Sequence, residues 1–189
     1  MAGFGKVEKK IVEITSEPNP TDLCGCKSGR VYSECCMPLH QDPQAPIDSA
    51  TKLVRARFSA YVYSKISFLL LSTHPESKDY EKDEEAIGSK RSKRTIWQKQ
   101  LEARATDTEF ANLQFVDETE SDIVDDNGLA SVSITLDRRP KSSLKFDKIA
   151  ERITVKKSSS GGFLYLGASS EIVELKNPQQ KVVKKKQMN

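Results

Sequence analysis

Four cysteines are the residues whose type and spacing point most directly to chemistry. Cys24 and Cys26 are separated by one residue, and after eight further residues Cys35 and Cys36 are adjacent. Four thiolates satisfy the tetrahedral preference of zinc, and a site closed by four protein ligands has no position for a substrate water. We therefore expect a structural zinc site. His40 is an alternative ligand, but four thiols already suffice.

Two other uses of the cysteines stay open, a redox-active thiol cluster and disulfides. Residues 1–10 have no apolar segment and cleavage site of the secretory kind. We therefore expect a reducing intracellular compartment, either the cytoplasm or, if a targeting peptide has been removed, an organelle stroma or matrix. The longest apolar run, Phe68–Leu71, is far shorter than the roughly 20 residues that span a bilayer. A soluble protein without membrane insertion is expected.

The segment Cys24–Cys36 resembles the SEC-C zinc motif, the knuckle found at the carboxyl end of the translocation ATPase SecA. Gly25 stands where that motif usually has proline, which affects the stiffness of the loop rather than the ligands. The resemblance implies zinc as the cofactor. Its ligands would be Cys24, Cys26, Cys35 and Cys36.

The resemblance continues beyond the cysteines, over about residues 21–176. Lys52–Tyr61, followed by Thr73-His74-Pro75, looks like the middle domain of the bacterial YchJ-like family, in which a SEC-C motif precedes a nuclear-transport-factor-two-like (NTF2-like) α+β cone. Two features differ from that family. Thr73 stands where tryptophan is expected, and the second SEC-C motif of many bacterial members is missing. The resemblance implies a fold and a metal, and it implies no reaction.

Two helices are predicted ahead of any strand. A long one over residues 50–72 contains no Gly or Pro and has apolar residues at three- and four-residue spacing. Asp48 or Ser49 can cap it. A shorter amphipathic helix is expected over 92–104.

From residue 110 the apolar period changes to two, which predicts strands. We expect them near residues 110–115, 130–136 and 149–155, and from 164 onward. Asp126-Asn127-Gly128 is typical of a tight hairpin between the first two. Helices followed by an antiparallel meander predict an α+β fold, an NTF2-like cone with helices packed on a curved antiparallel sheet, preceded by a small zinc knuckle.

Length and charge limit the organisation of the chain. Its 189 residues suit one core and exclude two large domains. The net charge of +3 is too near balance to indicate a nucleic-acid binder by itself. Basic clusters at 90–94 beside Trp97 and at 181–186 keep direct RNA contact open. We expect a flexible arm, the SEC-C zinc knuckle, the NTF2-like domain and a basic tail at residues 1–20, 21–39, 48–176 and 177–189.

Two charged residues fall on faces that should be apolar. Arg57 shares a helix face with Leu53 and Tyr61, and Glu151 alternates in phase with the apolar residues of its strand. Because an unpaired buried charge is costly, we expect an Arg57–Glu151 ion pair. The alternative is that these two residues line a ligand pocket, together with Tyr61 and His74.

These observations favour a non-catalytic zinc-binding adaptor. Its knuckle would present Lys27 and Arg30 to a protein or ribosome-associated partner. The main alternative is a small-ligand-binding protein or enzyme that uses the cavity of the cone, and a thiol redox sensor is a third. No arrangement of nucleophile, base and orienting residue is evident, so no catalytic residue is assigned.

Overall fold

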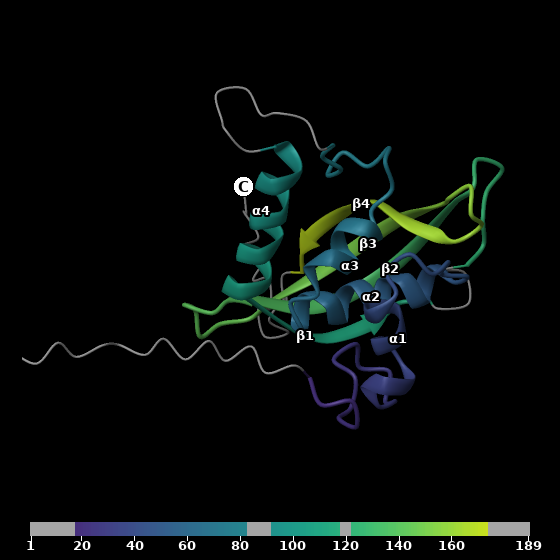
Figure 1. Ribbon diagram of the computed structural model, residues 1–189. Helices are drawn as coiled ribbons and strands as arrows, with labels where there is room; N and C mark the ends of the chain where they lie inside the picture. The colour runs from purple at the N-terminus through teal and green to yellow at the C-terminus, as the bar shows by residue number, and fades with distance from the viewer. Residues whose placement is uncertain (1–17, 83–91, 118–121, 174–189) are drawn as a thin grey trace, which may run out of the picture.

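The fold is built on one antiparallel sheet that is covered by helices, as Figure 1 shows. The computed structural model describes residues 18–82, 92–117 and 122–173. The sheet order follows the chain, β1-β2-β3-β4. The strands are β1 (Thr108–Phe115), β2 (Leu129–Pro140), β3 (Asp147–Lys157) and β4 (Phe163–Ile172). The predicted α+β class and four-strand meander are confirmed.

The helices precede the sheet in the chain. A turn of 3-10 helix and four α-helices are described: η1 (Tyr32–Glu34), α1 (Met37–Gln41), α2 (Ala50–Val62), α3 (Ile66–Leu71) and α4 (Lys93–Asp107). Figure 1 shows α2 and α3 against one face of the curved sheet, with α4 at one end of it. The knuckle lies below α1 in this view, beside the cone. None of the described helices is long and apolar enough to cross a membrane.

The predicted helix over 50–72 is interrupted at Tyr63, and the prediction of one continuous helix is wrong. The N–H of Lys65 donates to the carbonyl of Ala60 (2.8 Å), and Ser64 adopts a left-handed conformation with φ 54°. This is the hydrogen bond of a Schellman helix end. The sequence hides it because serine occupies the position that glycine usually takes. The break turns α3 back against α2 and α4.

The sheet presents one apolar face to the helices. Val132, Ile134 and Leu136 of β2 are buried, as are Ile149 and Val155 of β3, which confirms the predicted alternation. The prediction of a tight hairpin between β1 and β2 is wrong, because 13 residues (116–128) separate the two strands. Residues 125–128 form a turn in which the side chain of Asp125 accepts hydrogen bonds from two backbone N–H groups. Among these four residues, only Gly128 has a positive φ (75°).

An irregularity between β3 and β4 decides which side chains face the helices. Ile153 is opposite Ala168, but Val155 is opposite Tyr165, so the strand carries one extra residue at this point. Such a bulge reverses the alternation along the strand. Tyr165 and Ala168 therefore face the same side, although they are three residues apart.

Several sequence predictions concern residues outside these ranges. Most of the arm, the tail, and Lys90 and Arg91 of the basic cluster lie outside the described residues. Trp97 is buried, and its ring packs edge-on against Tyr80 with centroids 5.8 Å apart. Trp97 is therefore a core residue. The domain boundaries stay predictions.

Candidate functional site

The four cysteine sulfurs form one tight cluster. All Sγ atoms lie within 4.8 Å of one another, with 3.5 Å between Cys26 and Cys35 and 3.8 Å between Cys35 and Cys36. Zn–S bonds of about 2.3 Å place the sulfurs of a tetrahedral site about 3.8 Å apart. The four residues are free thiols, three of them buried. The donor set and its spacing thus fit a zinc ion.

Short turns bring these sulfurs together. The N–H of Lys27 donates to the carbonyl of Cys24 (3.0 Å), and the N–H of Cys24 donates to the carbonyl of Arg30 (2.8 Å). Lys27 and Gly29 both have positive φ, 62° and 80°. The chain then returns through η1, and Cys36 precedes α1. The loop is thus folded tightly around the cluster by its own backbone.

The electrostatics of the cluster favour a cation at its centre. Hydrogen bonds from neighbouring thiols, chiefly Cys24, lower the pKa of Cys26. Hydrogen bonds with Cys24 and, next in size, with Cys26 raise the pKa of Cys36. A hydrogen bond to Cys35 raises the pKa of the Arg30 guanidinium. Close-packed thiols cannot all ionise together unless a metal ion compensates their charge.

His40 lies outside the cluster. Its Nδ1 accepts from the hydroxyl of Tyr32 (2.8 Å), and its Nε2 donates to the carbonyl of Ala56 (2.9 Å). Burial lowers the pKa of His40, which favours this neutral tautomer. Both ring nitrogens are therefore used, one toward η1 and the other toward α2, and the cysteines are the ligand candidates.

The contacts of Gly25 explain why this position has glycine where the SEC-C motif usually has proline. Its N–H donates to the hydroxyl of Tyr63 (2.6 Å), and proline has no N–H to donate. A Cβ at this position would lie 3.1 Å from the ring of Tyr63 and from Val62. Arg55 of α2 also donates to the carbonyl of Cys26 (3.4 Å). The knuckle is thus packed directly against the cone.

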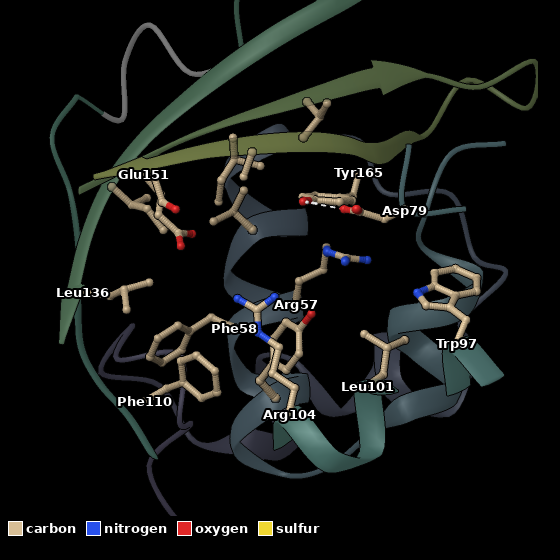
Figure 2. Close-up of a pocket in the computed structure, with 17 residues that line it drawn as sticks. Arg57, Phe58, Asp79, Trp97, Leu101, Arg104, Phe110, Leu136, Glu151 and Tyr165 are labelled. Carbon is tan, nitrogen blue, oxygen red and sulfur yellow. Dashed lines mark hydrogen bonds between the residues drawn. The ribbon is translucent and has the colours of Figure 1, made fainter. Parts of the chain in front are cut away.

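The cone contains a second candidate site, a pocket of about 270 Å³ between the helices and the sheet. Figure 2 shows side chains from both layers pointing into it. Arg57 and Tyr61 come from α2, Arg104 from α4 and Glu151 from β3. The pocket is therefore lined by charged as well as apolar groups.

The expected Arg57–Glu151 ion pair is not formed. Arg57 Nη1 instead donates to the carbonyl of Leu69 (3.0 Å) and to the hydroxyls of Ser72 (2.7 Å) and Thr73 (3.2 Å). Its guanidinium carbon lies 4.1 Å from the ring centroid of Tyr165. These acceptors, at the end of α3, hold the guanidinium in place of the carboxylate. Both residues nevertheless line the same pocket.

Of the other two polar residues predicted for the pocket, one lines it and one does not. Tyr61 lines the pocket, whereas His74 is absent from its lining. The N–H of His74 donates to the carbonyl of Tyr165 (2.7 Å), and its Nδ1 accepts from the N–H of Glu76 (3.1 Å). Burial lowers the pKa of His74. His74 therefore joins the end of α3 to β4, away from the pocket lining.

Sequence reasoning missed four polar residues of the pocket: Asp79, Arg104, Tyr165 and Ser170. Arg104 carried a usable signal, because it follows Trp97 and Leu101 at helical spacing and so shares their face. Tyr165 carried only an indirect signal: the bulge in β4 sets its direction, and Gly167 inside the strand marks that bulge. Asp79 lies in a charged segment without periodicity, and the hydroxyl of Tyr165 donates to it (3.3 Å).

Comparison with known proteins decides the family. The model described as "YchJ, middle NTF2-like domain" matches residues 49–168. The chain belongs to this YchJ-like family. The match covers α2 through β4 as far as Ala168, and so includes most of the residues that line the pocket of this YchJ-like chain.

Similar proteins extend the agreement. A UPF0225 protein of Xanthomonas campestris pv. campestris (strain 8004) is 41% identical over 66 residues, 35% of this chain and 50% of the relative. One of Geobacter sulfurreducens is 36% identical over 58 residues, 31% of this chain and 35% of the relative. The matched part of the YchJ-like chain thus spans half or less of these relatives.

A solved structure shares the fold. A SEC-C-motif-containing protein of Psychrobacter arcticus superposes with a TM-score of 0.53 and 19% identity, over 83% of each chain. The predicted family and cone are confirmed. The cysteine cluster and the SEC-C likeness also suggest metal binding.

Proposed function

We propose that this YchJ-like protein is a non-catalytic zinc-binding adaptor whose knuckle contacts a protein or ribosome-associated partner. The observation that carries the proposal is the cluster of Cys24, Cys26, Cys35 and Cys36. Four sulfurs fill the coordination shell of zinc, so no position remains for substrate or water. Such a site shapes a surface rather than performing a reaction.

Three exposed side chains of the knuckle supply a contact surface, which we name the knuckle surface: Leu23, Lys27 and Arg30. All three are exposed, and 69% of Leu23 is accessible although it is apolar. Leu23 forms a bridge with Val31, which places it beside the start of η1. Two cations and an exposed apolar residue in one short loop suit an acidic segment with an apolar anchor.

Zinc would determine whether this surface exists. The knuckle is too short to bury an apolar core of its own, and zinc binding supplies on the order of 10 kcal/mol to the folding of such modules. Lys27 and Arg30 lie in the loop between the two cysteine pairs. Their positions would therefore depend on the metal, and partner binding should depend on it as well.

The test is affinity purification from cell extract with the full zinc-loaded chain. We expect the partner to be lost after chelation, in the Cys35→Ser/Cys36→Ser variant, and in the Lys27→Glu/Arg30→Glu variant. The matched control is Lys145→Glu/Arg152→Glu, which reverses two exposed charges elsewhere on the surface. A partner that all these variants retain would contradict the adaptor. A partner released by nuclease would identify RNA as the contact.

A further inference from the structure

Arg57 is a buried cation with part of its guanidinium unused. The residue is 8% exposed, and its three hydrogen bonds all come from Nη1. Within the part of the chain that the structure describes, neither Nε nor Nη2 has a hydrogen-bond partner. Asp79 lines the same pocket and acts on Arg57 electrostatically, but it forms no ion pair with it within 4.0 Å. These two nitrogens form the edge of the guanidinium that matches the two oxygens of a carboxylate.

Glu151 is the complementary feature on the sheet side of the same pocket. Its carboxyl group is half-buried and forms no hydrogen bond with any described residue. Burial raises its pKa, while Arg104 and Arg138 act in the opposite direction from a distance. The pocket thus holds an acceptor on β3 and a cation on α2. Figure 2 shows the guanidinium of Arg57 beside Tyr165 and Asp79, and that of Arg104 between Arg57 and Glu151.

Apolar groups line the rest of the pocket. Phe58 and Phe110 meet edge-to-face with centroids 6.4 Å apart, and Ile134 and Leu136 line the pocket from β2. The volume of about 270 Å³ lies just below the range of roughly 300–1,000 Å³ typical of small-molecule sites. A molecule with a single ring fits this space better than a nucleotide or a lipid chain.

The geometry points to a binding site for a small aromatic carboxylate that carries a hydroxyl group at its far end. The carboxylate pairs with the Nε and Nη2 edge of Arg57, the ring packs against Phe58 and Phe110, and the hydroxyl donates to Glu151. Arg104, the second cation of the lining, adds attraction for the anion. This site is separate from the cysteine cluster and does not depend on the adaptor role.

Three probes of one size test the polarity of the site: para-hydroxyphenylacetate, phenylacetate and tyramine. They are titrated calorimetrically into the full zinc-loaded protein at neutral pH. We expect para-hydroxyphenylacetate to bind, and phenylacetate to bind about tenfold more weakly because the hydrogen bond to Glu151 is lost. Tyramine, which carries an ammonium in place of the carboxylate, should not bind.

Two variants locate the site. Replacing Arg57 would also release the carbonyl of Leu69, so the pocket is blocked instead by Ala168→Leu at an exposed position of its lining. The matched control is Ala150→Leu in β3. Ala150 pairs with Glu171 of β4, and its side chain lies on the other face of the sheet. Ala168→Leu should abolish binding, and Ala150→Leu should preserve it. Glu151→Gln should reduce the tenfold preference for the hydroxyl compound.

Three results would overturn the inference. The first is that neither acid binds, and the second is that Ala168→Leu binds both acids as the unmodified protein does. The third is tighter binding of tyramine than of the acids, because that would assign the site to a cation recognised by the carboxylates of the lining, Glu151 and Asp79. None of these three results bears on whether the knuckle retains its partner in the affinity purification. The two proposals therefore fail independently.

Discussion

The backbone N–H of Gly25, between two cysteines of the cluster, donates a 2.6 Å hydrogen bond to the hydroxyl of Tyr63 at the end of α2. This bond joins the knuckle to the helix that carries Arg57. The rings of Tyr63 and Tyr32 also meet edge-on, with centroids 4.8 Å apart. Knuckle and cone therefore share one buried core, and changes in one should be measurable in the other.

Gly25→Pro, which restores the residue usual in the SEC-C motif, should destabilise this protein. The substitution removes the N–H and brings ring atoms against Tyr63 and Val62, where even a Cβ would lie at 3.1 Å. Tyr63→Phe removes the hydrogen bond alone and should cost about 1 kcal/mol. Urea unfolding of the zinc-loaded protein should show a larger loss for Gly25→Pro than for Tyr63→Phe. Equal stability of Gly25→Pro and the unmodified protein would contradict the packing argument.

Removal of the metal should destabilise the cone as well as the knuckle. His40 connects Tyr32 of the knuckle to the carbonyl of Ala56 in α2, and Arg55 reaches the carbonyl of Cys26. Trp97 lies in the cone and provides a fluorescence probe that is remote from the cysteines in sequence. We expect chelation to lower the unfolding temperature seen by Trp97. An unfolding temperature that chelation leaves unchanged would show that the two parts are energetically independent.

The sequence predicted the fold and the cysteine cluster well because both depend on local patterns. Cysteine spacing limits the ways in which four thiols can meet, and period-two alternation identifies β2 and β3 directly. The break after α2 was missed because Ser64, rather than glycine, takes the left-handed position. Local propensity gives little warning of such a helix end.

The pocket was harder to predict because its geometry depends on long-range contacts. Arg57 was expected inside the cone and lies there, but its acceptors come from the end of α3, a turn that the sequence did not reveal. Tyr165 faces the pocket because of a bulge at the β3–β4 pairing. A one-residue shift of register reverses the side chains of a strand, and the local mark of it in β4 is a single glycine, Gly167, beside the shift.

Asp122 should stabilise α2 from 72 residues away. Its carboxylate accepts from the N–H of Ala50 (2.6 Å) and from the hydroxyl of the cap residue Ser49 (2.9 Å). A carboxylate at a helix N-terminus satisfies a free N–H and interacts favourably with the helix dipole. Asp122→Ala should therefore lower the free energy of unfolding by about 1 kcal/mol. The matched control Asp126→Ala, in the turn before β2, should change it little, and equal losses would contradict the cap.

Glu151 should make stability depend on pH in a direction opposite to that of a salt-bridged carboxylate. Burial raises its folded-state pKa above the unfolded value, so the folded protein favours the protonated form. That contribution is fully present below the unfolded pKa of about 4.3 and is lost as the pH rises through the folded pKa. At neutral pH the charged carboxylate therefore costs stability, and Glu151→Gln should raise the free energy of unfolding.

The measurement is urea unfolding of Glu151→Gln and the unmodified protein in parallel from pH 7 down to pH 4. The gain from the substitution should be largest at neutral pH and should shrink as the pH falls, since protonation then removes the same charge. Acid loss of metal affects both proteins, so the difference between them isolates Glu151. A gain that grows toward acidic pH would mean that Glu151 is stabilised as the anion, and would assign it to an ion pair.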